Sequence, residues 1–87
     1  MSAPLDSITD PWELLDEVGR YPRMRVRAAN YSRFIALVAH QPSAQQYMLT
    51  YEAFRIFHIP NQTIRLDLER SRLLALLESR TFYARNS

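Results

Sequence analysis

A single glycine, Gly19, is present in a chain of 87 residues that five prolines divide into segments. Sheet folds of this size depend on several glycine turns, so the near absence of glycine favours helices separated by the prolines. An apolar fraction of 47% is enough for one compact core. We therefore predict an all-α fold, a small bundle of three to four helices built by a single domain over residues 1–87.

The positions of the helices follow from capping signals and apolar spacing. Asp10 suits an N-cap, Pro11 suits the first helical position, and Gly19 suits a left-handed helix stop. Helices are predicted over residues 11–18, 29–40, 43–57 and 61–84, with residues 1–9 as a loose or docked lead segment. The third helix carries apolar side chains around more than half of its circumference, so it is the predicted core helix.

Two short segments, residues 23–28 and 63–68, alternate polar and apolar side chains. This spacing also suits strands, which leaves an α+β alternative with the two segments paired as a short two-stranded ribbon. An isolated ribbon is marginally stable, and the leucine-rich sequence after residue 68 has helical spacing. The all-α prediction is therefore preferred.

The segment 61–84 places apolar residues on two nearly opposite sides of one helix. One stripe contains Ile64, Leu68, Ala75 and Phe82, and the other contains Leu66, Leu73, Leu77 and Ala84. In so small a domain the second stripe needs its own cover. We expect that cover to be either the helix at 11–18 or a partner, including a second copy of the chain.

Charge is sorted by position along the chain. The first 19 residues hold five acidic residues and no basic one, whereas the remainder holds 11 arginines against four acids, a net charge of +7. The stretch 20–33 concentrates arginines that can contact phosphates. The acidic helix beside it would repel the same phosphates, so the split favours a docking surface, within the chain or between chains.

The composition also indicates the cellular compartment in which the protein is expected. The chain has no cysteine and its first residues are acidic rather than basic or apolar, which predicts a cytoplasmic protein or one in another reducing intracellular compartment. The longest apolar run covers residues 34–39, far below the ~20 residues that span a bilayer. We therefore expect no membrane insertion.

The sequence offers little for catalysis. Its two histidines, His40 and His58, fall on different predicted helices without a neighbouring carboxylate motif. One glycine cannot form a phosphate-binding loop, and histidines at metal-ligand spacing are missing. We predict a non-enzymatic protein with no catalytic residues, no cofactor and no metal site.

Glu52-Ala53 is followed by Ile56-Phe57-His58-Ile59-Pro60 and then by Thr63-Ile64-Arg65. This pattern resembles the helix-turn-helix half of a sigma-factor region 4 domain. Phe54 and His58 stand where that motif has a small residue and a glycine, and Phe54 is expected to hold the two helices apart. The resemblance implies a small DNA-binding regulator that uses residues 51–72, with nucleic-acid contacts from Gln62, Thr63, Arg65, Arg70 and Arg72.

Protein binding accounts for more of the sequence. Interfaces are enriched in aromatic residues and arginine and depleted in lysine, which this chain lacks. Trp12 lies on a short acidic helix of the kind that docks in an apolar groove. We therefore predict an adaptor, regulator or accessory subunit that binds another protein, with a homodimer as one form. The predicted protein-binding residues are Trp12, Leu15, Val18, Arg20, Arg23, Arg25, Arg27, Leu66, Leu73 and Leu77.

Overall fold

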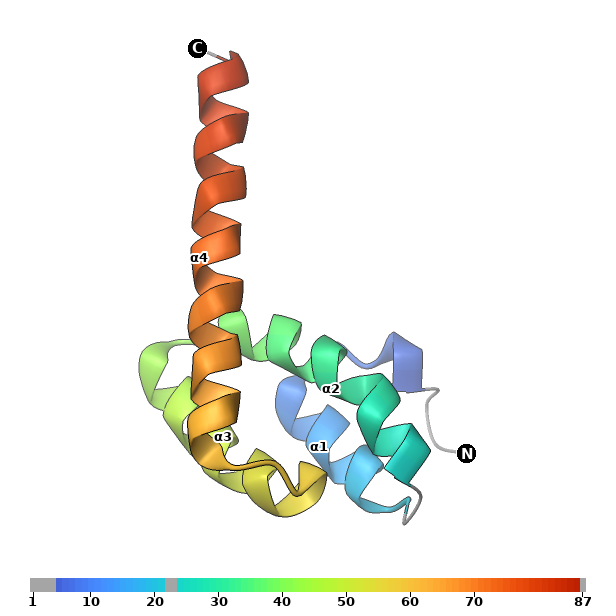
Figure 1. Cartoon of the computed structure of the whole chain (residues 1–87). Coiled ribbons are helices and arrows are strands. Elements are labelled where there is room, and N and C mark those ends of the chain that lie inside the picture. Colours follow the sequence, from blue (N-terminus) through green and yellow to red (C-terminus); the bar gives the residue numbers. More distant parts are fainter. Residues whose placement is uncertain (1–4, 22–23, 87) are drawn as a thin grey trace.

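The structure is a computed structural model that describes the backbone of residues 5–21 and 24–86 and the side chains of residues 5–21 and 27–80. A 3-10 turn, η1 (Leu5–Ser7), precedes the helices α1 (Pro11–Gly19), α2 (Met24–Ala39), α3 (Ser43–Phe57) and α4 (Asn61–Asn86). The described residues contain no strand, and the predicted all-α bundle is confirmed (Figure 1).

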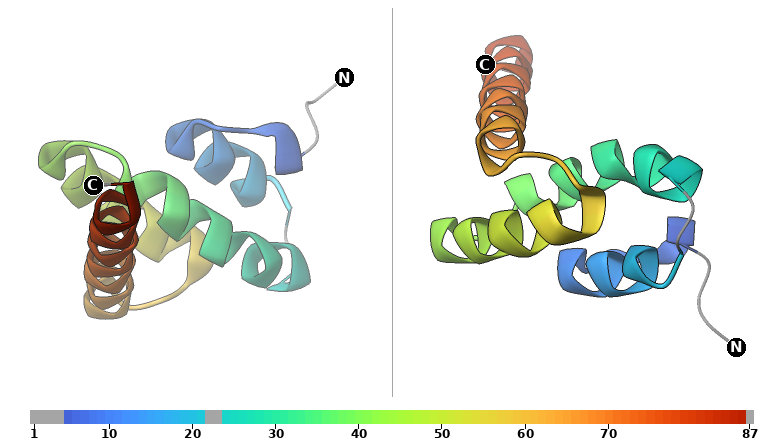
Figure 2. Two further views of the ribbon diagram at one scale, coloured as in Figure 1. Left: turned by 90° about the horizontal axis from the view of Figure 1, so that it is seen from above. Right: turned by 60° about the horizontal axis from the view of Figure 1, so that its bottom comes forward.

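The helices form a small body from which α4 projects. α1 and α4 lie on opposite sides of the pair formed by α2 and α3, and both pack against that pair (Figure 2). With 26 residues, α4 is about 39 Å long and extends well past the body (Figure 1). The molecule consequently measures 48 × 30 × 22 Å.

The core draws on all four helices. Phe34 of α2 lies at its centre, fully buried, and its ring is 5.3 Å from that of Phe57 on α3. Tyr31 meets the same Phe57 ring edge to face at 5.3 Å. The buried apolar side chains are Ile8, Leu14, Leu15, Val18, Phe34, Ile35, Val38, Leu49, Ala53, Phe57, Ile64 and Leu68.

The ends of α1 follow the sequence signals in part. The Asp10 side chain accepts a hydrogen bond from the Trp12 backbone N–H at 3.0 Å, and Pro11 opens the helix, as predicted. The left-handed stop at Gly19 is wrong, because Gly19 ends the helix without a positive φ. Gly19 serves close packing instead, since a Cβ there would lie 3.0 Å from Cδ1 of Ile56.

The alternating segments are helical. Residues 24–28 form the first turn and a half of α2, and residues 63–68 lie inside α4, so the ribbon alternative is wrong. As a helix, the second segment directs Ile64 and Leu68 to the same buried side of α4. A ribbon would have put these residues on one face without a second layer to cover it.

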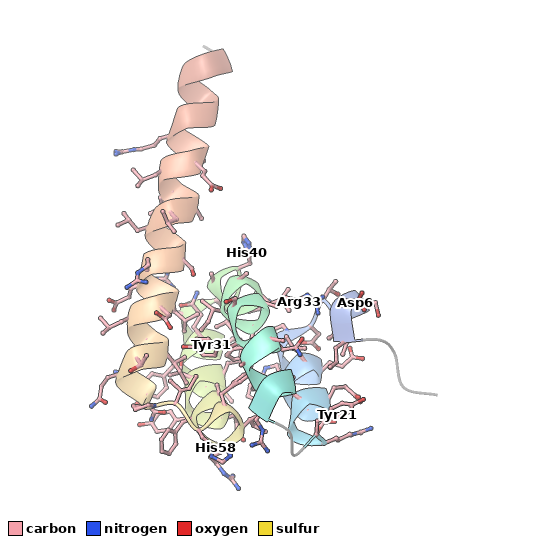
Figure 3. All side chains as sticks on the ribbon, turned by 45° about the vertical axis from the view of Figure 1, so that its right-hand side comes forward. Asp6, Tyr21, Tyr31, Arg33, His40 and His58 are labelled. Atoms are coloured by element: carbon pink, nitrogen blue, oxygen red, sulfur yellow. The ribbon has the colours of Figure 1, made fainter. Side chains whose placement is uncertain are left out.

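The lead segment is docked on α2 from residue 5 onward. Ile8 is buried, and the Arg33 guanidinium donates hydrogen bonds to three backbone carbonyls, those of Leu5, Asp6 and Ile8 (Figure 3). Arg33 comes from the basic stretch, and its guanidinium binds carbonyls of η1 and of Ile8.

Candidate protein-binding surface

The projecting segment of α4, residues 72–86, is the most prominent exposed apolar feature. Every side chain from residue 72 to residue 80 is exposed. Leu73 and Leu76 are 57% and 59% exposed, and Leu74 and Leu77 are 53% and 48% exposed. Because single exposed leucines are ordinary but four in five positions are not, this segment is a candidate contact surface.

The two apolar stripes predicted on this helix differ in burial. Ile64 and Leu68 pack into the core, whereas Leu66 on the other side is 61% exposed. The body reaches only as far as the half-buried Ser71, so Ala75 of the inner stripe is exposed as well. Phe82 and Ala84 lie beyond the described side chains. The helix at residues 11–18 does not cover the outer stripe, since α1 lies across the α2–α3 pair from α4 (Figure 2).

The predicted contact residues of α1 are mostly internal. Leu15 and Val18 are 3% and 0% exposed, which corrects their assignment to a surface: they anchor α1 to the α2–α3 pair. Trp12 is 36% exposed, and its indole N–H donates to the Gln45 side-chain oxygen at 3.0 Å. Trp12 therefore ties α1 to α3 and leaves only part of its ring at the surface.

Two arginines of the predicted cluster, Arg20 and Arg27, have described side chains, and their surroundings differ. Arg20 forms ion pairs with Asp16 and Glu17 of its own helix at 3.4 and 3.1 Å. Arg27 borders a largely apolar hollow of about 400 Å³, and its Nε is buried without a hydrogen-bond partner among the described residues. Arg23 and the side chain of Arg25 lie outside the described residues.

An aromatic surface on α3 was missed by the sequence analysis. Tyr47, Met48, Tyr51 and Phe54 are each about half exposed, although α3 was predicted to be the core helix. Only Leu49, Thr50, Ala53 and Phe57 of α3 are buried, because the helix lies at the surface of a small body. The i, i+4, i+7 spacing of Tyr47, Tyr51 and Phe54 was the signal available, and it fits a buried stripe equally well.

This aromatic surface has a polar rim. The hydroxyls of Tyr47 and Tyr51 are hydrogen-bonded at 3.2 Å, and the Arg65 guanidinium lies 4.9 Å above the Tyr47 ring. This hydrogen bond lowers the pKa of Tyr47, and the nearby Arg65 lowers it further. The same hydrogen bond raises the pKa of Tyr51. Both hydroxyls are in contact with solvent, so the arrangement presents flat rings with hydrogen-bonding groups at their edges.

The residues named by the helix-turn-helix resemblance are all exposed on α4. The connection has the expected shape: His58 adopts a left-handed conformation with φ 57° at the end of α3, where the motif has glycine. Phe54 does not separate the helices, and that expectation is wrong, because it is 46% exposed while Ala53 is fully buried.

The exposed side of α4 is not a basic strip. Arg65 stacks on Tyr47, and Arg72 donates a hydrogen bond to Gln46 of α3. Between these two arginines and Arg70, the exposed face of the helix carries Leu66, Glu69 and Leu73.

A polar contact fixes the inner side of α4 to α2. The Tyr31 hydroxyl donates to the Asp67 carboxylate at 2.7 Å. Burial, reinforced by this carboxylate, raises the pKa of Tyr31 far above its usual value. The hydroxyl therefore stays protonated and holds the two helices together.

The described residues gather no group of three or more histidine, cysteine or acidic side chains that could hold a metal ion. His40 and His58 lie at opposite ends of the body (Figure 3). No helix within the described ranges has the length and hydropathy needed to cross a membrane. No protein-family model, curated protein or solved structure matches the chain.

Proposed function

We propose that this protein is a non-enzymatic protein-binding module, an adaptor, regulator or accessory subunit, whose main contact surface is the projecting segment of α4. The observation that carries this proposal is the exposure of Leu73, Leu74, Leu76 and Leu77 on a helix that has left its own core. The two histidines are far apart, and the absence of cysteine suits a reducing intracellular compartment.

Two physical arguments support a partner on this segment. A contiguous apolar patch is costly to leave in water, and such patches on folded proteins mark interaction sites. An isolated helical segment of about 15 residues is only marginally stable in water, so a partner would also stabilise the helical form of the projecting segment. The recognition mode is a helix laid against an apolar groove or a second helix.

The aromatic surface of α3 is a second contact area. Tyrosine, methionine and phenylalanine side chains are typical of interface centres. The aromatic ones have only two side-chain torsions and therefore lose little conformational entropy on binding. Tyr47, Tyr51 and Phe54 lie beside the start of α4, next to Pro60, Gln62 and Arg65. A partner that follows the outer side of α4 toward the body would reach them.

The proposal is tested by binding experiments with a triple variant, Leu66→Ser, Leu73→Ser and Leu77→Ser, and a control with Arg55→Ser on the exposed side of α3. Proteins retained by the wild-type chain from its native host are identified, purified and titrated by calorimetry. We expect the triple variant to bind at least about 100-fold more weakly and the control to bind normally. If the triple variant bound the partner as tightly as the wild type does, α4 would not be the contact surface.

The alternative function is a small DNA-binding regulator, and the left-handed turn at His58 between α3 and α4 favours it. In this case Arg65, Arg70 and Arg72 contact phosphates, and affinity for duplex DNA falls steeply with salt. Fluorescence anisotropy with labelled duplexes measures this. We expect binding to be weak and unchanged by Arg65→Glu with Arg72→Glu, because Leu66, Glu69 and Leu73 lie among these arginines. Salt-dependent binding abolished by that double variant would establish the alternative.

A further inference from the structure

We propose that the partner of the projecting segment is a second copy of the same chain, paired antiparallel through α4 about a two-fold axis between Leu74 and Ala75. This inference rests on the proposed function and names its partner. It is carried by the spacing of the exposed residues, by their charges, and by the position of the body relative to the exposed face.

The exposed residues on one side of α4 have the spacing of a helix–helix contact. Leu66, Glu69, Leu73, Leu76 and Arg80 follow one another at intervals of three, four, three and four residues. This is the repeat that keeps one seam of a helix in contact with a second helix along its length. All five side chains are exposed. Leu74 is equally exposed but lies about 120° away from the centre of this seam.

The second step is the direction of the seam. The side chains that pack α4 into the body, Ile64, Leu68 and the half-buried Ser71, lie on the opposite side of the helix. Arg65 and Arg72, which contact Tyr47 and Gln46 of α3, lie beside the seam. From Leu73 outward the seam therefore lies beyond the body of its own chain, and at Glu69 it borders a hollow between α3 and α4. The proposed axis lies about 10 Å beyond Leu68, so the two bodies sit at opposite ends of the helix pair.

The third step is charge, which selects the orientation. In the antiparallel pair, Leu73 of each chain faces Leu76 of the other, and Glu69 of each chain faces Arg80 of the other. A parallel pair in register would place Glu69 against Glu69 and Arg80 against Arg80. A shift of the antiparallel pair by one residue, with Leu73 facing Leu77, would place Arg70 against Arg80. Of these three arrangements, only the proposed register joins leucine to leucine without placing like charges against each other among Glu69, Arg70 and Arg80.

The apolar contact is tested first. The concentration dependence of mass is measured by sedimentation equilibrium for the wild type, for Leu73→Ser with Leu76→Ser, and for the control Leu74→Ser. We expect the wild type to dimerise, the double variant to dimerise at least about 100-fold more weakly, and the control to resemble the wild type. Circular dichroism and a thermal melt on each variant verify that the body is folded.

The orientation is tested by charge exchange. Glu69→Arg and Arg80→Glu each create two pairs of like charges in the antiparallel dimer, and each should raise its dissociation constant about tenfold. The combined variant, Glu69→Arg with Arg80→Glu, restores opposite charges and should dimerise like the wild type. In a parallel dimer the single variants only replace one like-charged pair by another, so no loss and no rescue would occur.

The results separate this inference from the proposed function. A wild-type chain that stays monomeric at high concentration overturns self-pairing, as does a control variant that fails as badly as the double variant. If such a monomer still binds a different protein through Leu66, Leu73 and Leu77, the proposed function stands and only its partner changes. If it binds neither itself nor another protein, both are wrong.

Discussion

α1 and the projecting segment of α4 contain the same local pattern with opposite outcomes. Leu14, Leu15 and Val18 have the spacing i, i+1, i+4, and so do Leu73, Leu74 and Leu77. The first three are 0%, 3% and 0% exposed, whereas the second three are 57%, 53% and 48% exposed. Apolar spacing therefore indicates which side of a helix is apolar. It does not indicate whether other parts of the same chain bury that side.

The difference arises from how each helix is held. α1 has nine residues, too few to persist alone, and it lies so close to α3 that a Cβ on Gly19 would be 3.0 Å from Cδ1 of Ile56. α4 is anchored by Ile64 and Leu68, and its helix propagates outward through good helix formers whose described side chains from residue 72 to residue 80 are exposed. The helical form of α1 depends on burial, and the helical form of residues 72–86 depends on propagation.

The largest contrast is expected between two leucine truncations. Leu14→Ala removes a fully buried side chain and should lower the free energy of unfolding by about 2–5 kcal/mol. Leu73→Ala, measured in dilute solution where no dimer forms, should change it by less than about 0.5 kcal/mol. Urea unfolding followed by circular dichroism checks both. A comparable loss from Leu73→Ala would show that the projecting segment is covered within its own chain.

The next contrast concerns two arginines. Arg33→Leu removes the hydrogen bonds to the carbonyls of Asp6 and Ile8 at 2.7 and 2.6 Å, together with the one to Leu5. It should destabilise the fold by about 1.5–3 kcal/mol and expose the lead segment to proteolysis. Arg80→Leu in the projecting segment should have little effect in dilute solution. Equal stability of both variants would mean that the lead segment is not held by Arg33.

A smaller effect is expected at the start of α1. Asp10→Ala deletes the cap of the Trp12 N–H and should cost about 1 kcal/mol. Asp16→Ala on the same helix removes only an exposed ion pair with Arg20 and should stay within about 0.5 kcal/mol of the wild type. Thermal melts at matched concentration compare the two. If the two variants melt together, the cap does not hold α1 in place.

The smallest effect is a pH dependence at the contact between α2 and α4. The pKa of Tyr31 is raised in the folded state above its ordinary value of 10.0, so its stabilising contribution is complete below that value. It declines as the pH rises above about 10, where the unfolded chain releases the proton. The stability difference between the wild type and Tyr31→Phe should therefore shrink between about pH 9 and pH 11. A constant difference would show that the hydrogen bond to Asp67 does not couple to ionisation.

Much of the fold was predictable from local signals. The prolines and Asp10 marked the boundaries of α1, α3 and α4 to within about two residues, because caps act on the backbone next to them. α2 begins earlier than predicted, at Met24 rather than residue 29, since a six-residue alternation is compatible with both helix and strand. The outer leucines of α4 were also found from spacing alone.

The rest of the candidate surface was not predictable in this way. Leu15 and Val18 were assigned to a contact surface and are buried, whereas α3 was predicted to be the core helix and carries Tyr47, Tyr51 and Phe54 half exposed. Both errors have one cause. Helical spacing identifies a side of a helix, and which side faces the core depends on where the other helices lie.

By itself, the sequence determined that this protein is helical, where most of its helices begin and end, and that α4 carries apolar side chains on two sides. These are consequences of backbone chemistry at the proline and aspartate positions and of the 100° turn per residue. Only the tertiary structure determined that the apolar side of α1 is buried in the core and that α4 extends beyond the body after Ser71. That decision depends on how far a body of this size can reach along a 26-residue helix, a property of the packed helices and of no single segment.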